Sequence, residues 1–166
     1  MLTVGVGEEV LKQLNDKLEG KRPSRRSARY SDINGGLGIA PRKSYSGDAG
    51  YDLVVSEDVD IAPHTFADVK TGIAIELPHG VWARITGRSS TLRKRGVLVN
   101  EGIIDNGYRG ELFIGAYNLT NLVVHIKQGE RIAQLIPHEI VSVRWRRTDK
   151  LKPSLRGTSG FGSSGK

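Results

Sequence analysis

Short stretches in which apolar and polar residues alternate fill the chain from about residue 45 to 145. Alternation at every second position is typical of strands that bury one face. Because no long amphipathic helix separates these stretches, the pattern favours an all-β barrel or jelly-roll over a doubly wound α/β sheet. The clearest sets are Ile73, Ile75 and Leu77, then Val81, Ala83 and Ile85, and later Leu112, Ile114 and Ala116.

Turn-forming sequences separate the alternating stretches at short spacings. Proline, glycine and asparagine fix or permit the backbone angles that tight turns need. The 21 glycines among 166 residues fit a fold with many such turns. The turns predicted in this way are Ala62-Pro63-His64, Pro78-His79-Gly80, Asp105-Asn106-Gly107 and Lys127-Gln128-Gly129.

The two ends of the chain differ from this central part. Residues 9–18 carry leucine and valine at helical spacing, which predicts a helix of about three turns. Residues 21–29 hold five basic residues and no acidic one, and the Gly- and Ser-rich tail from Arg156 onward is predicted to be flexible. We therefore divide the chain into an N-terminal extension (residues 1–40), a core (41–150) and a C-terminal arm (151–166).

Charge and composition exclude several classes of function. The chain carries 25 Lys and Arg against 18 Asp and Glu, a net charge of +7, which favours an anionic partner without choosing among nucleic acid, acidic membrane and nucleotide. It has no cysteine, which excludes disulfides, thiolate metal sites and thiol nucleophiles. No run approaches the roughly 18 apolar residues of a membrane span, and the charged N-terminus does not resemble a signal peptide, so we expect a cytoplasmic protein without membrane contact.

Five short segments stand out because polar residues are set among glycines. In chain order they cover residues 48–53 (DAGYDL), 87–90 (GRSS), 102–112 (GIIDNGYRGEL), 129–136 (GERIAQLI) and the tail from Arg156 to Gly165. This ordered set resembles the five motifs of trimeric dUTPases and spans nearly everything from residue 41 to the C-terminus. The resemblance implies a distorted jelly-roll β-barrel, a homotrimer with shared active sites, and Mg²⁺-dependent hydrolysis of dUTP to dUMP and pyrophosphate. That reaction keeps uracil out of DNA and supplies dUMP for dTMP synthesis.

Asp105 lies between an apolar pair and a glycine turn, a position that would hold its carboxylate at a β-hairpin, partly shielded from water. Such a carboxylate can act as a general base, although Asp followed by Asn-Gly is also ordinary turn chemistry. The resemblance to dUTPases favours the base, since it implies that Asp105 activates a water for in-line attack on the α-phosphorus.

Tyr108 can be interpreted as a strand aromatic that packs across the same hairpin. The resemblance implies that Tyr108 instead lies under the deoxyribose and leaves no room for a 2′-hydroxyl, while the hairpin backbone at Gly102 and Ile104 binds uracil. A tight hairpin rejects the methyl of thymine and the amino group of cytosine, because misplaced groups clash or leave buried polar atoms without partners.

Arg88, Ser89 and Ser90 are candidate phosphate ligands, because a guanidinium offers fixed donors and a serine offers a compact hydroxyl. A solvated loop is the alternative. The second dUTPase motif usually reads Pro-Arg-Ser-Gly, whereas Gly87 and Ser90 occupy the outer positions here. Gly-Arg-Ser-Ser is common in dCTP deaminases, which share the fold, so this departure keeps a deaminase open as an alternative.

Asp52 can be a surface carboxylate near a turn, and Gln134 can simply end a buried strand. The resemblance adds both residues to Asp105 as the catalytic set: Gln134 reaches the α-phosphate and the attacking water, and Asp52 helps to organise Mg²⁺ and the arginine of the tail. Because Mg²⁺ keeps several waters and binds phosphate oxygens directly, we expect Asp52 to act on the metal through water.

The resemblance also gives the arm a function. It implies that Arg156 binds the γ-phosphate, that Phe161 stacks on uracil, and that the backbone near Gly162 and Ser163 wraps the phosphates. In dUTPases the arm closes over a site on another subunit, and closure excludes water from the reacting phosphoryl group.

Two other functions stay open at this stage. A dCTP deaminase, or a bifunctional deaminase and dUTPase, needs a glutamate that would align with Gly115, and glycine cannot do acid-base chemistry. A nucleic-acid-binding or regulatory protein is suggested by residues 21–29 and 144–156, which contain 11 of the 25 basic residues. Aromatic residues make up only 6% of the chain, however, and Trp82 and Trp145 are interpreted as packing residues, so nucleic acid is not the expected partner.

Overall fold

The computed structural model describes residues 26–33 and 35–159. The predicted helix at residues 9–18 and the arm residues Phe161, Gly162 and Ser163 lie outside the described residues.

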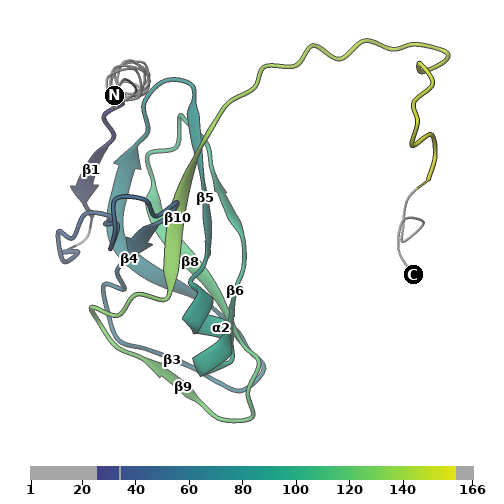
Figure 1. Ribbon diagram of the computed structural model, residues 1–166. Helices are drawn as coiled ribbons and strands as arrows, with labels where there is room; N and C mark the ends of the chain where they lie inside the picture. Colours follow the sequence, from purple (N-terminus) through teal and green to yellow (C-terminus); the bar gives the residue numbers. More distant parts are fainter. Residues whose placement is uncertain (1–25, 34, 160–166) are drawn as a thin grey trace, which may run out of the picture.

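Two four-stranded sheets enclose the core, and a two-stranded sheet closes one end (Figure 1). The first sheet has the order β1-β4-β8-β6, the second β2-β10-β5-β7, and the small sheet pairs β3 with β9. This arrangement confirms the predicted all-β fold of the jelly-roll type. The elements are β1 (Arg29–Asp32), β2 (Tyr51–Leu53), β3 (Val59–Ile61), β4 (Phe66–Glu76), β5 (Val81–Gly87), α2 (Ser89–Arg95), β6 (Val97–Val99), β7 (Gly102–Ile104), β8 (Glu111–Asn118), β9 (Val124–Ile126) and β10 (Ala133–Glu139).

The alternating residues form the core, as the sequence predicted. All nine apolar residues of the three clearest sets are at most 7% exposed, and they belong to one continuous cluster between the sheets. Leu112, Ile114 and Ala116 on β8 are fully buried, while Phe113 between them is 42% exposed. Burying one face of each strand supplies most of the stabilising apolar contact in such a fold.

The four predicted turns are all present. Each of the pairs 63–64, 79–80, 106–107 and 128–129 forms a turn between strands. Gly80 and Gly129 adopt φ angles of 75° and 86°, which side chains with a Cβ rarely tolerate. The turns therefore depend on glycine at these two positions.

The predicted β-hairpin at Asp105 is wrong in one respect. The strands on either side of the turn, β7 and β8, do not pair with each other, because β7 pairs with β5 while β8 pairs with β4 and β6. The turn therefore carries the chain from one sheet to the other. Gly110 lies so close to Tyr108 that an added Cβ would be 2.4 Å from the phenolic oxygen, so a larger residue here would require the Tyr108 side chain to move.

The strands do not begin and end where the chain was divided into an extension, a core and an arm. Strand β1 joins the first sheet although it precedes residue 41, and β10 ends at Glu139, after which residues 140–159 are exposed and run away from the body (Figure 1). Trp145 lies in this segment and is 91% exposed. The prediction that it packs within the chain is therefore wrong. Among the described residues, no helix is long and apolar enough to cross a membrane.

Candidate active site

Asp52 lies in the middle of β2 and is the centre of a charged cluster. It is only 8% exposed, and its two carboxylate oxygens face two arginines. Oδ1 is 2.8 Å from Nε of Arg88, and Oδ2 is 3.3 Å from Nη1 of Arg131. Asp52 is therefore a buried counter-ion that orients two cations, which the sequence did not predict.

Arg88 follows the last residue of β5 and precedes the first turn of α2, which contains Ser89 and Ser90. Its backbone N–H donates to the carbonyl of Ile132 at 3.2 Å, and its Nη1 donates to the carbonyl of Arg131 at 3.1 Å. These bonds tie the end of β5 to the segment that precedes β10. As a result, Arg88 and Arg131 lie on either side of Asp52.

Gln134 lies directly opposite Asp52 in the antiparallel pairing of β10 with β2. Its Nε2 donates to the carbonyl of Gly87 at 3.1 Å. Gly50 leaves the space that this side chain occupies, since a Cβ at residue 50 would lie 2.1 Å from Oε1 of Gln134. The structure thus brings Asp52, Arg88 and Gln134 together.

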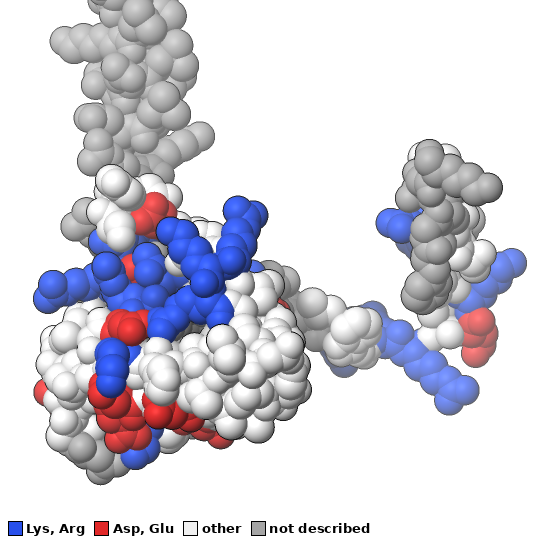
Figure 2. Space-filling view, turned by 90° about the horizontal axis from the view of Figure 1, so that it is seen from below, with Lys and Arg blue, Asp and Glu red and all other residues white. Residues whose placement is uncertain are grey.

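Basic side chains gather at this end of the body. Helix α2 lies at the lower end in Figure 1 and adds Arg93, Lys94 and Arg95 in its last turn. The view from below shows Lys and Arg side chains gathered on the body, with Asp and Glu beside them (Figure 2). In the described part of the chain, no three His, Asp or Glu side chains are grouped to hold a metal ion. The cluster is suited to bind an anion.

Asp105 lies on the turn between β7 and β8, and it is exposed in the single chain, not partly shielded as predicted. Its carbonyl accepts a hydrogen bond from the N–H of Tyr108 at 3.1 Å. Tyr108 is 42% exposed, and its hydroxyl donates to the carbonyl of Glu111 at 2.9 Å. Both side chains are therefore accessible at the surface of a well-braced turn.

The two backbone candidates, Gly102 and Ile104, are the ends of β7, which is the edge strand of its sheet. The side chain of Ile104 belongs to the core cluster, so only the backbone of this residue can reach a ligand. An edge strand has one row of N–H and C=O groups facing away from its neighbour. The edge of β7 is thus chemically suited to pair with the polar edge of a base.

The Asp52 cluster and the Asp105 turn are far apart within one chain. Gln134 pairs with Thr86, whereas Ile104 pairs with Ala83 and Asp105 lies one residue further along. The two residues are offset by four residues along the strands and by two strand-to-strand spacings across the sheet. This offset places the backbones of Gln134 and Asp105 roughly 16 Å apart. Arg156 belongs to neither group, because it lies on the exposed segment that leaves the body.

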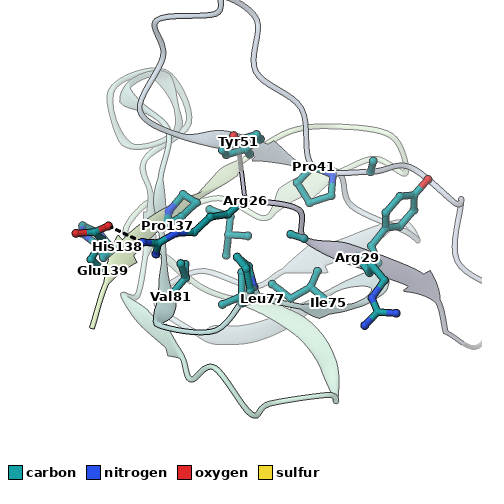
Figure 3. Close-up of a pocket in the computed structure, with 15 residues that line it drawn as sticks. Arg26, Arg29, Pro41, Tyr51, Ile75, Leu77, Val81, Pro137, His138 and Glu139 are labelled. Carbon is teal, nitrogen blue, oxygen red and sulfur yellow. Dashed lines mark ion pairs between the residues drawn. The ribbon is translucent and has the colours of Figure 1, made fainter. Parts of the chain in front are cut away.

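An apolar pocket of about 650 Å³ lies beside β1 (Figure 3). Tyr51 and Leu135 line this pocket, while their neighbours Asp52 and Gln134 belong to the charged cluster. Alternation along a strand explains the division, because successive side chains point to opposite faces. The pocket is therefore separate from the candidate active site.

Two residues of the site were missed by sequence reasoning. Arg131 lies inside the fourth motif, and its position two residues before Ala133, at the start of a strand pattern, was the available signal. Asn106 was treated as part of the turn alone, but its side chain reaches the neighbouring turn between β4 and β5. Neither partner could be inferred without the sheet register.

An exposed ion pair between Asp58 and Lys127 lies away from these groups. The pKa of Asp58 is lowered because the backbone N–H of Gln128 and the side chain of Lys127 hydrogen-bond its carboxylate, and the pKa of Lys127 is raised mainly by the same carboxylate. Both groups are exposed, with Nζ of Lys127 2.9 Å from Oδ2 of Asp58. This pair joins the β9–β10 turn to the segment before β3.

Comparison with known proteins places the chain in a family. The dUTPase family model matches residues 38–165. The deoxyuridine 5′-triphosphate nucleotidohydrolase of Tropheryma whipplei is 44% identical over 133 residues, which cover 78% of this chain and 90% of that protein. The corresponding protein of Paramecium bursaria Chlorella virus 1 is 42% identical over 125 residues, covering 75% and 89%.

The solved structure of Staphylococcus bacteriophage 80alpha dUTPase with dUPNHPP is similar to this one, with a TM-score of 0.79 and 27% identity. The match covers 85% of this chain and 99% of that chain. Sequence and structure thus agree over the strands that carry both groups of candidate site residues. The chain belongs to the dUTPase family.

Proposed function

We propose that the chain hydrolyses dUTP to dUMP and pyrophosphate, and that Asp105 is the general base that activates water for attack on the α-phosphorus. Membership of the dUTPase family supports the reaction. The observation that carries the proposal is the division of the site into two groups: a cationic cluster around Asp52 and an accessible carboxylate on the Asp105 turn.

The cationic cluster is assigned to the triphosphate. Arg88 supplies donors that are already oriented by Asp52, so little side-chain freedom is lost when a phosphate binds. Ser89 and Ser90 in the first turn of α2 add hydroxyl donors beside it. Gln134, held by the carbonyl of Gly87, is assigned to the α-phosphate and the attacking water.

The Asp105 turn and β7 are assigned to the nucleoside. The edge of β7 from Gly102 to Ile104 offers backbone groups to uracil, and the accessible ring of Tyr108 is assigned to the deoxyribose, where it excludes a 2′-hydroxyl. A backbone that pairs with uracil opposes like groups on cytosine, which leaves buried polar atoms unmatched.

The separation of the two groups supports a site shared between copies of the chain. Asp105 and Gln134 are both assigned to the attacking water, but about 16 Å between their backbones exceeds the reach of their side chains. A second copy must therefore supply Asp105 to the Asp52 cluster of the first. A closed ring of copies, as in a homotrimer, repeats this contact at every site.

The segment from residue 140 onward is assigned to a further contact between copies. Val141, Val143 and Trp145 alternate with polar residues and are 62–91% exposed, which is typical of a strand that buries one face on a partner. The apolar pocket beside the edge strand β1 is a matching surface (Figure 3). This arrangement would place Arg156 and the rest of the arm over a site on another copy.

The residues present fit an indirect role for Mg²⁺. Both oxygens of Asp52 are engaged by arginines, so a water-mediated contact to the metal suits this carboxylate better than direct ligation. Bound to the substrate phosphates, Mg²⁺ would neutralise charge and polarise the phosphoryl oxygens. The chain's own contribution is to orient the phosphates and to place the base.

A deaminase activity has no support at the position that would need a glutamate. Gly115 lies on β8 beneath the ring of Phe66, and a Cβ there would be 3.0 Å from the ring. A larger side chain at residue 115 would require Phe66 to move.

The test is a pyrophosphate-release assay with dUTP, dCTP, dTTP and UTP, each with and without Mg²⁺. We expect release from dUTP alone, dependence on Mg²⁺, and loss of turnover in Asp105→Asn with nucleotide binding retained. Release from dCTP or UTP at a comparable rate, or full activity in Asp105→Asn, would contradict the proposal.

A further inference from the structure

The side chain of Asn106 connects two turns that are far apart in the sequence. It is half-buried, and its Nδ2 lies 2.7 Å from the carbonyl oxygen of Pro78 and 2.8 Å from that of Val81. The carbonyl oxygen of Leu77 is 3.4 Å from the same atom. Asn106 thus links the turn that carries Asp105 to the turn between β4 and β5.

The surroundings fix which end of the amide faces this turn. Three carbonyl oxygens can only accept hydrogen bonds, so the amide must present its NH₂ group to them. An NH₂ group has two protons, and the two short contacts, to Pro78 and Val81, use both. The side chain therefore forms a two-pronged clamp with a single allowed orientation.

The β4–β5 turn is a rigid anchor for this clamp. The carbonyl of Pro78 also accepts the N–H of Val81 at 3.1 Å, which closes the turn, and Gly80 adopts a φ of 75°. The carbonyl of Gly80 accepts the N–H of Ile140 at 2.9 Å, which ties the anchor to the end of β10. Proline and these bonds leave the anchor little freedom to move.

The other bonds of the Asp105 turn brace it internally. Nη1 of Arg109 donates to the carbonyls of Asn106 and Tyr108 at 2.9 and 2.8 Å, and Tyr108 bonds Asp105 and Glu111. These contacts hold the shape of the turn, and the pairing of β7 with β5 fixes only its start, at Ile104. A longer ion pair of 3.7 Å, between Arg109 and Glu76, gives a weaker tie to β4.

We infer that Asn106 is a positioning residue: its clamp on the β4–β5 turn sets where the turn presents the carboxylate of Asp105. The inference rests on the proposed function, in which Asp105 from one copy meets the phosphates bound by another. A base that must reach across an interface depends on the placement of its turn, because a misplacement of about 1 Å can cost about 100-fold in rate. Substrate contacts at the phosphate cluster do not depend on the clamp.

The test compares Asn106→Ala and Asn106→Ser with the wild type in steady-state dUTP hydrolysis. The alanine variant loses both donors, and we expect kcat to fall about 10- to 100-fold, with a smaller rise in KM because Tyr108 on the same turn is assigned to the deoxyribose. Serine keeps one shorter donor, so its kcat should lie between those of alanine and the wild type. Asn121→Ala is the matched control, because this exposed asparagine bonds His64 far from the turn and should leave kcat unchanged.

Stability and binding are measured on the same samples. The melting temperature reports folding, and titration with a non-hydrolysable dUTP analogue counts the sites that can bind. A merely structural role would lower the number of binding sites, whereas lost positioning would lower kcat per binding site. Wild-type kcat in both Asn106 variants, or a loss carried by KM alone, would overturn the inference. If the wild type itself releases no pyrophosphate from dUTP, the proposed function fails, and this inference fails with it.

Discussion

Replacing Asp52 with asparagine removes the negative charge at the centre of the phosphate-binding cluster while keeping the size of the side chain. In the wild type, this carboxylate neutralises Arg88 at 2.8 Å and Arg131 at 3.3 Å. In Asp52→Asn, two guanidinium groups would face each other across a neutral amide that cannot compensate either charge. We therefore expect a loss of stability as well as a loss of activity.

The size of the stability loss follows from the exposure of the three side chains. Removing one partner of a fully buried ion pair costs about 3–5 kcal/mol, whereas exposed pairs contribute about 0–1 kcal/mol. The side chain of Asp52 is 11% exposed, against 30% for Arg88 and 50% for Arg131, so solvent screens the arginines in part. We expect a cost of roughly 2 kcal/mol, which lowers the melting temperature by about 4–8 °C in a chain of this size.

The assay is thermal unfolding of the wild type, Asp52→Asn and Asp58→Asn at one protein concentration, because assembly makes the melting temperature depend on concentration. Asp58→Asn is the matched control, since it breaks an exposed pair with Lys127. Equal shifts in the two variants would refute the argument that burial makes the Asp52 pairs strong.

Three further predictions follow from other parts of the chain. Truncation after Pro153 should leave the strands folded but severely reduce turnover of dUTP, and full activity would show that the arm is dispensable. Gly50→Ala should displace Gln134 from the carbonyl it bonds and lower kcat, so an unchanged kcat would argue against a role for Gln134 at the reacting phosphate. The depressed pKa of Asp58 means that its contribution to stability is present above the ordinary value of 3.8 and is lost as the pH falls through the folded-state pKa. An NMR titration of Asp58 with a midpoint at or above 3.8 would contradict this.

The strands and the core could be predicted because alternation reports directly on burial. Each residue of the three clearest alternating sets is buried, and each predicted turn is present. Pairing partners could not be predicted in this way. Alternation does not say which strand lies beside β7, and the assumption that β7 and β8 form a hairpin failed because the chain changes sheet at the Asp105 turn.

The candidate site was predicted in part for a similar reason. The motif residues Asp52, Arg88 and Gln134 come together because their strands and loop adjoin. Arg131 and Asn106 act through partners that are distant in the sequence, so only the register and the loop contacts identify them. Trp145 was expected to pack, yet it is 91% exposed, because the chain leaves the body after β10 and alternation alone does not show where that happens.

The sharing of one site between copies is the central claim, and a mixed oligomer tests it most directly. Asp105→Asn and Gln134→Ala are each expected to be inactive alone. Trimers that contain both variants, isolated through a different tag on each, should hold one site in three that combines an intact Asp105 from one copy with an intact Gln134 from another. We predict about one third of the wild-type rate of pyrophosphate release from dUTP. Mixed trimers that bind dUTP but remain as inactive as either parent would contradict the claim.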